Sequence, residues 1–389
     1  MYLVGIDISK YKHDCFILKE TGEVVSNPFS ISNNQDGFQS LLTVLNSLDP
    51  HEEIRIGFEA TSHYSLNLKL FLEKAHHSFM EFNPLLLAKF NKSQTLRRTK
   101  TDAIDSISIA RWLMTVDYKP YPVGFYHIYS LKSLTRLRDS LVKQRSFYIV
   151  KLTNVLDHTF PEFKPFFGNR FSKTALYLLE TYGSAQNMAQ MNPSSYESLR
   201  KISRGKFSMQ KFIKLKELAT NSVGANNDIF SLQLQSLLAL YNQCAKEVER
   251  LEEQIISLIS DIQPKSMTIP GIGPLSAAVI YAEYGNIQKF NSPSAMLSFA
   301  GLEPGYYQSG TSEHTGRMVK HGSSHLRFTL MNLCIPLIQY NIAFAEFYAK
   351  KRSEGKPHRV ACSHVIKKLI RIIYHLEKEN MDFDSSKLR

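Results

Sequence analysis

The first 120 residues alternate between two kinds of hydrophobic spacing, and this alternation constrains the fold more than any other feature of the chain. Five runs have the length and apolar content of strands, at 2–8, 13–19, 24–31, 54–58 and 78–82. Three segments have the 3.6-residue spacing of amphipathic helices, at 37–48, 64–74 and about 101–114. The resulting order is three strands, helix, strand, helix, strand, helix, which predicts an α/β domain built on one sheet.

This order of elements is that of a ribonuclease H-like (RuvC-like) domain, which we expect to span residues 1–122 and to end at Pro120 and Pro122. Between its last strand and its last helix lies a polar, basic segment that contains Lys89 and Lys92. We assign no helix to that segment.

Four acidic residues stand at informative places in this domain. Asp7 lies inside an apolar strand, where a buried carboxylate needs a partner or a metal. Glu59 ends the fourth strand, at the edge where α/β sheets bind ligands. Asp102 and Asp105 are three residues apart on an expected helix and share one face. Taken singly, Asp-x-x-Asp is typical of a helix N-terminus and Glu59 could cap the next helix.

The joint placement of the four acids makes a metal site an alternative of equal weight to these simpler interpretations. Clustered carboxylate oxygens are the ligands that Mg²⁺ or Mn²⁺ prefers. Two such ions about 3.5–4 Å apart can clamp the attacking and leaving oxygens of a phosphodiester. The sequence therefore predicts metal-dependent phosphodiester chemistry, with two ions.

The middle of the chain, which we take as 123–264, shows a heptad pattern. Between Leu234 and Ile262, nine apolar residues are spaced alternately three and four apart, and an earlier helix is expected at 130–156. The two helices form either a coiled coil that joins protomers or a helical hairpin within one chain, and both alternatives stay open. Residues 160–227 between them read as a loop-rich basic insert.

The last part, 265–389, is expected to be a mostly α-helical domain. It opens with a turn that resembles a helix-hairpin-helix, in which Gly271 and Gly273 would let backbone N–H groups approach a phosphate. A plain tight turn is the alternative. Further on, Ser309 precedes Gly310 in a glycine-containing loop, where a serine is either solvent-facing or a nucleophile that attacks phosphorus. Ser312 is a second candidate for that role.

The charge of the chain favours polyanionic partners. Lys and Arg number 47 against 35 Asp and Glu, which gives a net charge of +12. A solvated basic surface without a partner is the alternative. The basic residues that we expect to contact nucleic acid, beside the two glycines, are Arg97, Arg98, Lys100, Arg317, Lys320 and Arg327.

Several classes of protein are disfavoured by composition. The four cysteines have no zinc or disulfide spacing, which fits a reducing cytoplasm. The N-terminus lacks the pattern of a signal peptide, and no apolar run approaches the roughly 18 residues of a membrane span. We expect a cytoplasmic protein without membrane contact.

Motifs along nearly the whole chain resemble the DEDD insertion-sequence transposases, a family that also includes the Piv-type DNA invertases. The similar stretches are GIDISK, FEATSHY, RRTKTDAIDSISIARW, IPGIGPLSAA, SFAGLEPGYYQSG and KHGSSHLRFTLMN. The middle region is where the resemblance is weakest.

The resemblance implies a RuvC-like metal domain, a coiled-coil dimerisation region and a C-terminal transposase domain. By that match Asp7, Glu59, Asp102 and Asp105 hold Mg²⁺ or Mn²⁺, and Ser309 forms a covalent intermediate with DNA. It further implies double-stranded DNA as substrate (element ends and target), a structured bridge RNA as guide, and a homodimer that assembles into a tetramer. In such an assembly the acids of one protomer work with the serine of another. The protein would be bacterial and associated with the nucleoid when active.

Three other functions are weighed against a transposase. A site-specific DNA invertase shares the same chemistry. A RuvC-like nuclease would cut with metal-activated water and leave Ser309 as part of a loop. A non-catalytic nucleic-acid-binding protein would need none of the four acids. The resemblance, more than the residues by themselves, favours a recombinase.

Overall fold

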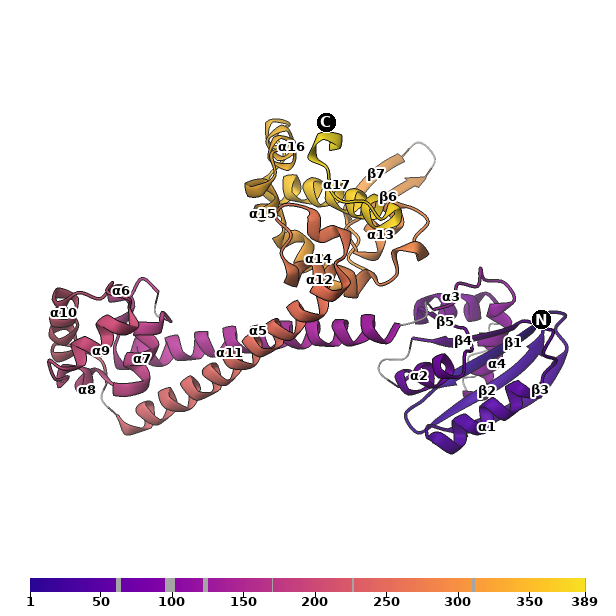
Figure 1. Cartoon of the computed structure of the whole chain (residues 1–389), viewed down its shortest axis with the longest axis horizontal. Helices are drawn as coiled ribbons and strands as arrows, with labels where there is room; N and C mark the ends of the chain where they lie inside the picture. Colours follow the sequence, from indigo (N-terminus) through magenta and orange to yellow (C-terminus); the bar gives the residue numbers. More distant parts are fainter. Residues whose placement is uncertain are drawn as a thin grey trace. The chain divides into compact units, whose positions relative to one another are not determined.

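The computed structural model describes residues 1–60, 64–94, 102–121, 125–169, 171–225, 227–309 and 312–388 (Figure 1). The chain divides into two compact units. The first comprises Met1–Tyr129 with Gly285–Asn291, and the second comprises Ser130–Tyr284 with Ser292–Arg389. Each unit is treated by itself below.

The first unit is built on one five-stranded mixed sheet. Its strands are β1 (Tyr2–Ile8), β2 (Lys12–Lys19), β3 (Val24–Ser32), β4 (Ile54–Glu59) and β5 (Phe79–Phe82). They lie in the order β3-β2-β1-β4-β5; the pairs β1–β2 and β2–β3 are antiparallel, whereas β1–β4 and β4–β5 are parallel. Because β1, β4 and β5 are parallel, their carboxyl ends meet at the same edge of the sheet.

Four helices accompany this sheet: α1 (Gln35–Asn46), α2 (Leu66–Lys74), α3 (Pro84–Gln94) and α4 (Asp102–Leu113). The expected strands and helices of the α/β domain are all present. The expectation that no helix occupies the basic segment with Lys89 and Lys92 was wrong, because α3 covers it. Pro84 is the first residue of α3, a position where its missing N–H costs no hydrogen bond.

The two faces of the sheet carry different residues, as the period of a strand requires. Even-numbered side chains of β1 and β4, such as Val4, Ile6 and Phe58, pack in one core cluster with Leu41 of α1 and Leu68 of α2. On the other face, Leu3 packs with Ala110 and Leu113 of α4. α4 therefore covers the face onto which the odd-numbered residues of β1 and β4 project.

The second unit contains two 35-residue helices, α5 (Phe125–Thr159), whose first residues belong to the first unit, and α11 (Asp228–Ile262). Arg138 of α5 donates a hydrogen bond to Glu252 of α11 at 2.8 Å. On α11, the seam residues Val248, Leu251 and Ile255 are buried within one chain. Apolar side chains that stay exposed on these helices include Leu137, Phe147, Val150, Leu232 and Leu240.

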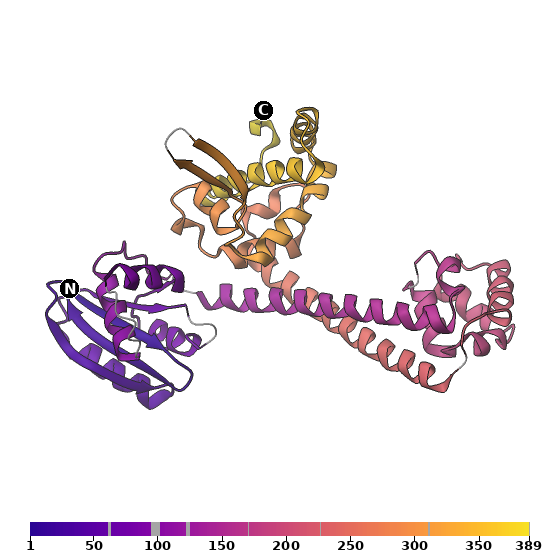
Figure 2. The same cartoon turned by 180° about the vertical axis from the view of Figure 1, so that it is seen from behind.

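Residues 160–227 fold into a small helical module, which we call the middle module. It contains α6 (Phe163–Phe166), α7 (Lys173–Tyr182), α8 (Ala185–Ala189), α9 (Ser195–Ile202) and α10 (Met209–Thr220), which gather at one end of α5 and α11 (Figure 2). The expectation of a loop-rich insert was wrong. Three of these helices begin at a serine whose hydroxyl accepts a hydrogen bond from a backbone N–H three residues later, namely Ser172, Ser184 and Ser208.

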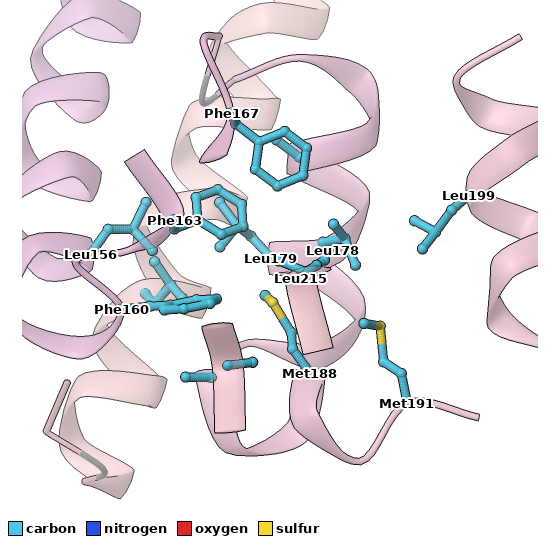
Figure 3. Close-up of a cluster of buried hydrophobic side chains, with 14 of the residues drawn as sticks. Leu156, Phe160, Phe163, Phe167, Leu178, Leu179, Met188, Met191, Leu199 and Leu215 are labelled. Carbon is cyan, nitrogen blue, oxygen red and sulfur yellow. The ribbon is translucent and has the colours of Figure 1, made fainter. Parts of the chain in front are cut away.

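A hydrophobic core of its own holds the middle module together. Phe160, Phe163, Leu178, Leu199 and Leu215 are all at most 2 % exposed and lie in the cluster drawn in Figure 3. The cluster also takes in residues from the end of α5 and the start of α11, Leu152, Val155, Leu156, Leu234 and Leu238. Burial of this many large apolar side chains is enough to order helices that are individually too short to be stable in water.

The rest of the second unit is mostly helical, as expected. Its elements are η1 (Lys265–Thr268), α12 (Pro274–Tyr284), α13 (Pro293–Phe299), β6 (Pro304–Ser309), β7 (Ser312–Met318), α14 (Ser324–Asn332), α15 (Cys334–Tyr340), α16 (Ile342–Ser353), α17 (His358–Glu379) and η3 (Ser385–Leu388). A further short turn of helix, η2 (Ile287–Lys289), belongs to the first unit. The glycine-containing loop expected around Ser309 is instead an antiparallel β-hairpin, β6–β7.

Among the residues that the structure describes, no single helix is long and apolar enough to cross a membrane. Only the consecutive helices Ser324–Tyr340 and Ile342–Ser353 reach that length and hydropathy jointly, and they are bent by 109°.

Candidate active site

Asp7 and Glu59 lie on the same face of the sheet, on neighbouring strands. Ile6 of β1 is the register partner of Phe58 of β4, so the residue after each, Asp7 and Glu59, occupies adjacent positions at the carboxyl ends of two parallel strands. Both are odd-numbered and half-buried, and both belong to the face that α4 covers. The strand geometry thus brings together two acids that are 52 residues apart in sequence.

α4 brings the other two acids to the same end of that face. A Cβ added at Gly5 would lie 2.3 Å from the backbone oxygen of Ser106 and 2.5 Å from the backbone nitrogen of Ala110, so α4 runs in close contact with β1. The step of two residues along β1 from Gly5 to Asp7 covers about 6.6 Å. The same distance along α4, taken toward its N-terminus, is slightly more than one helical turn of about 5.4 Å. Asp7 is therefore level with the first turn of α4, which holds Asp102 and Asp105. The side chain of Asp102 lies outside the described residues, and Asp105 is half-buried.

Asp14 is an acid of this region that the sequence analysis missed. It is the direct register partner of Asp7 on β2, and its side chain is 9 % exposed. The Ser30 hydroxyl donates a hydrogen bond to Asp14 Oδ1, and the Lys12 ammonium lies 3.0 Å from Asp14 Oδ2. Asp14 directly precedes the apolar run Cys15–Leu18 of β2, and an acid beside such a run is the signal that could have identified it.

The chemistry of these donors fits a divalent metal ion. Every acid at this edge offers carboxylate oxygens, which suit Mg²⁺ or Mn²⁺ and do not suit softer metals. Among the side chains that the structure describes, no group of three or more His, Cys, Asp or Glu is close enough together to hold a metal ion. The side chain of Asp102 is not among those that the structure describes. The fit of the acids to a divalent metal ion therefore rests on where they lie in the fold and on their carboxylate oxygens.

The other predicted chemical residue, Ser309, is the last residue of β6. It is the register partner of Ser312, the first residue of β7, so both serine candidates stand at the tip of the hairpin. The side chains of Ser309, Ser312 and Arg317 lie outside the described residues. Three predicted phosphate-binding residues, Arg97, Arg98 and Lys100, also fall outside them.

The two glycines of the helix-hairpin-helix-like turn have different surroundings. Gly271 has φ +100°, and a Cβ there would lie 2.9 Å from the backbone oxygen of Pro336, so this glycine lets the turn pack against α15. A Cβ at Gly273 would meet nothing within 4 Å. Of the two glycines, Gly273 has the open side that an approaching phosphate needs.

Lys320 and Arg327 also differ in how exposed their side chains are. Lys320 is exposed, whereas Arg327 is half-buried and donates a hydrogen bond from Nη1 to the Ala300 carbonyl at 3.3 Å. A Cβ on Gly301, which has φ +67°, would lie 2.6 Å from Arg327 Nη1. Arg327 therefore packs closely against Gly301 and hydrogen-bonds to the carbonyl of the residue before it.

Glu283 of α12 is a buried acid that the sequence analysis did not consider. It is 2 % exposed; Arg136 of α5 donates to both of its oxygens at 2.7 and 3.0 Å, and the Ser323 hydroxyl donates at 2.9 Å. Burial alone would raise the pKa of Glu283, but the hydrogen bonds from Arg136 and the nearby charge of Lys132 hold that pKa below its usual value. Because Ser323 caps α14, this cluster ties α5 and α12 to the helix that follows the β-hairpin.

Two family models match the chain. A DEDD-type model described as "Transposase" matches residues 4–161, which include all four predicted metal ligands. A model described as "Transposase IS116/IS110/IS902 family" matches residues 265–349, which include Ser309 and the turn with Gly271.

Curated relatives of similar length accompany these matches. The pilin gene-inverting proteins of Moraxella bovis and Moraxella lacunata are each 24% identical over 385 residues, which cover 98% of this chain and 97% of theirs. An insertion element IS116 protein of Streptomyces clavuligerus is 22% identical over 397 residues, 98% of this chain and 95% of that protein. The similarity therefore runs through both units and the middle module.

Proposed function

Since the chain belongs to the IS110-type family of DEDD transposases and is a DNA recombinase or transposase by that membership, we propose that it cuts and rejoins DNA through a covalent serine–DNA intermediate with the help of divalent metal. The observation that carries the proposal is the meeting of Asp7, Glu59 and the first turn of α4 at one edge of the sheet, in a chain that also presents Ser309 on a hairpin. The α/β unit is then a RuvC-like catalytic domain.

In this proposal Asp7, Glu59, Asp102 and Asp105 would hold two Mg²⁺ or Mn²⁺ ions. When bound, these ions supply positive charge that stabilises the charge developing on the phosphate oxygens. The acids themselves fix the position of the site relative to the sheet. Asp14, held by Ser30 and Lys12, adds a further negative charge beside Asp7.

The serine step conserves the number of phosphodiester bonds. The hydroxyl oxygen of Ser309 attacks phosphorus, a bond between that oxygen and phosphorus forms, and the bond from phosphorus to one DNA oxygen breaks. The departing DNA oxygen takes up the proton that the serine gives up. Attack by another DNA hydroxyl then reverses the step and releases the serine, so joining needs no external energy source. A water-based nuclease has no such route to joining.

Trapping of the covalent intermediate tests the proposal. Wild-type protein and the Ser309→Ala and Ser312→Ala variants would be incubated with Mg²⁺ and end-labelled element DNA, and adducts would be separated on denaturing gels. We expect Ser309→Ala alone to abolish the adduct. Cleavage that continues in Ser309→Ala would instead indicate a RuvC-like nuclease, and adduct loss only in Ser312→Ala would move the nucleophile to that residue. Full activity in Asp102→Ala with Mg²⁺ would favour a protein that only binds nucleic acid.

We also propose the partners that this reaction needs. They are double-stranded DNA from the element ends and the target, a structured bridge RNA, and further copies of the chain as dimer and tetramer. The exposed apolar residues Leu137, Phe147 and Val150 on α5 are available for contact between copies. The division into 1–122, 123–264 and 265–389 is proposed as the functional one.

A site-specific DNA invertase is the second candidate, because two relatives of nearly full coverage carry the name pilin gene-inverting protein. A plasmid with two element ends in inverted orientation separates the two functions. An invertase would flip the intervening segment and leave the plasmid intact. A transposase would excise or move it.

A further inference from the structure

The middle module holds a large share of the chain's positive charge. Residues 160–227 contain ten Lys and Arg but only four Asp and Glu, a net +6 of the +12 of the whole chain. Within them, residues 200–216 contain seven basic residues and no acid. The active-site residues described above use none of these cations.

In the folded module, most of these basic side chains face solvent and not the hydrophobic core. Leu199 on α9 and Leu215 on α10 point into the buried cluster (Figure 3) and are fully buried. Six cations on the same two helices and on the turn between them are exposed, namely Arg200, Lys201, Arg204, Lys206, Lys211 and Lys214. The acids Glu197 and Glu217 on these helices are exposed as well, and Lys216 is half-buried. Folding of this module therefore creates one basic surface from a segment that is basic in sequence.

The surface is hollowed where α9 ends. A depression of about 570 Å³ is lined by Arg200, Lys201, Arg204 and Gly205 together with Glu197 and Ser198. The turn below it is tightly shaped, since Arg204 has φ +53° and Gly205 has φ +81°, and their N–H groups bond to the carbonyls of Lys201 and Arg200. These hydrogen bonds define the shape of the turn, and three of the six residues that line the depression are cationic.

Most of these cations have no acidic partner that would compete with a ligand. Among the residues that the structure describes, Lys201, Arg204, Lys206 and Lys211 form no ion pair. Arg200 is 4.0 Å from Glu197 with both side chains more than half exposed, a weak pair, and Lys214 is 3.1 Å from Glu217. Unpaired cations in and beside a depression favour a polyanion.

We propose that this surface, formed by Arg200, Lys201, Arg204 and Lys206 with Lys211, is a second nucleic-acid site, made of residues other than the catalytic ones, that binds a phosphodiester backbone. Arg200, Lys201 and Arg204 line one depression and can contact more than one phosphate, and the absence of aromatic residues in 200–206 argues against base stacking as the main contact. The site deepens the proposed function, on which it rests for the presence of DNA or RNA. Its role there is to hold nucleic acid while cutting occurs elsewhere.

Neutral substitutions at the depression test the proposal in the full-length protein. The variant is Arg200→Gln, Lys201→Gln and Arg204→Asn combined, with asparagine at 204 because it tolerates a positive φ. The matched control replaces three exposed lysines outside this surface, Lys164→Gln, Lys173→Gln and Lys246→Gln, and removes the same charge. Circular dichroism and thermal melting of both variants would establish that each is folded.

Binding is measured by fluorescence anisotropy over a range of salt, with a random-sequence duplex DNA in one arm and a hairpin RNA in the other. Removing one phosphate-binding cation lowers the slope of log affinity against log salt by about 0.9 on duplex DNA and about 0.7 on single strands. The slope of the depression variant should therefore be smaller by roughly 2 to 3 for the nucleic acid that this surface binds. Across a fourfold rise in salt, its duplex affinity should then fall by a factor about 40 times smaller than that of wild type.

The outcomes are distinct. A reduced slope only in the depression variant supports the proposal, and the arm that changes identifies DNA or RNA as the ligand. Equal reductions in both triple variants, or none in the depression variant, would overturn it. Photocross-linking of bound nucleic acid to peptides from 195–211 is a second measurement, and cross-links confined to other peptides would also overturn it. A missing serine–DNA adduct bears on the proposed function alone, because these binding experiments need no cleavage.

Discussion

The contact between Gly5 and α4 predicts how a single methyl group affects the site. In Gly5→Ala the new Cβ would lie 2.3 Å from the Ser106 carbonyl oxygen and 2.5 Å from the Ala110 nitrogen. Both are backbone atoms of α4, so no side-chain rotation can relieve the clash. To reach an ordinary contact of 3.4 Å, α4 has to retreat from β1 by about 1.1 Å.

The size of the effect follows from this displacement. Overpacking of a close-packed interior costs about 1–3 kcal/mol, and contact with two backbone atoms places Gly5→Ala at about 3 kcal/mol. For a unit of this size the melting temperature should fall by roughly 10 °C. Because α4 carries Asp102 and Asp105, a retreat of about 1 Å should also lower the rate of adduct formation by up to about 100-fold.

The single tryptophan of the chain makes the measurement specific. Trp112 lies on α4, is 9 % exposed and packs edge-on against Phe82 with ring centroids 4.4 Å apart. Its fluorescence therefore reports unfolding of the first unit alone, without a tryptophan signal from the second. Urea titrations followed at the Trp112 emission would give the loss of stability, and the emission of the folded variant would show whether α4 has moved.

Gly57→Ala is the matched control. The three atoms nearest to its Cβ all belong to the side chain of Leu113, the closest at 2.7 Å and 2.9 Å, and that side chain can change rotamer at a cost of about 1 kcal/mol. The order of destabilisation should therefore be Gly5→Ala well above Gly57→Ala. Equal stability of the Gly5→Ala variant and wild type, or a larger effect in Gly57→Ala, would refute the placement of α4 against β1.

Three further changes have defined outcomes. Glu283→Gln should reduce stability at neutral pH by about 2 kcal/mol, because it replaces charge-assisted hydrogen bonds from Arg136. The pKa of Glu283 is lower in the folded state than its usual 4.5, so its contribution is complete above about pH 4.5 and declines as pH falls through the folded pKa; unfolding followed by circular dichroism should show a shallower acid dependence in the variant. Gly271→Ala should cost about 1–3 kcal/mol in thermal melts, since φ is +100° and Pro336 is in contact, and a neutral result would contradict that packing. Asp14→Asn should weaken Mn²⁺ binding in calorimetry, and unchanged affinity would limit Asp14 to holding its neighbours.

The strands of the first unit were predictable because their apolar runs are short, continuous and bounded by turn residues. The position of Glu59 at a strand end followed from the same pattern. α3 was not predicted, since Lys89 and Lys92 make its segment look polar although Pro84 marks a helix start. The helices of the middle module were missed for a related reason. Three of them, α6, α8 and α9, span fewer than ten residues, which is too short for periodicity to register, and among these only α8 begins at a serine that caps it.

The acids of the site show where sequence reasoning ends. Asp7 could be identified from its strand, and the register that places it beside Glu59 follows from the parallel pairing of β1 and β4. Glu283 could not be assigned a partner, because Arg136 is 147 residues away and reaches it only through the packing of α5. Asp14 adjoins the apolar run of β2, but its closeness to Asp7 depends on the register of the β1–β2 pair. The sequence indicates which acids lie at unusual positions, and the pairing of strands and helices determines which of these acids come close together.

The self-contained core of the middle module has a consequence for how this family can diversify. Leu156 and Leu234 enter that core from the two long helices, so the chain leaves α5 and returns to α11 at one packed junction. A segment with neighbouring ends can be shortened, exchanged or lost with only a short turn needed to reconnect the helices. Homologous recombination at this junction would change which nucleic acid the module binds and would leave the catalytic residues unchanged. The middle module is thus a place in the chain where a new nucleic-acid specificity can be added to the enzyme.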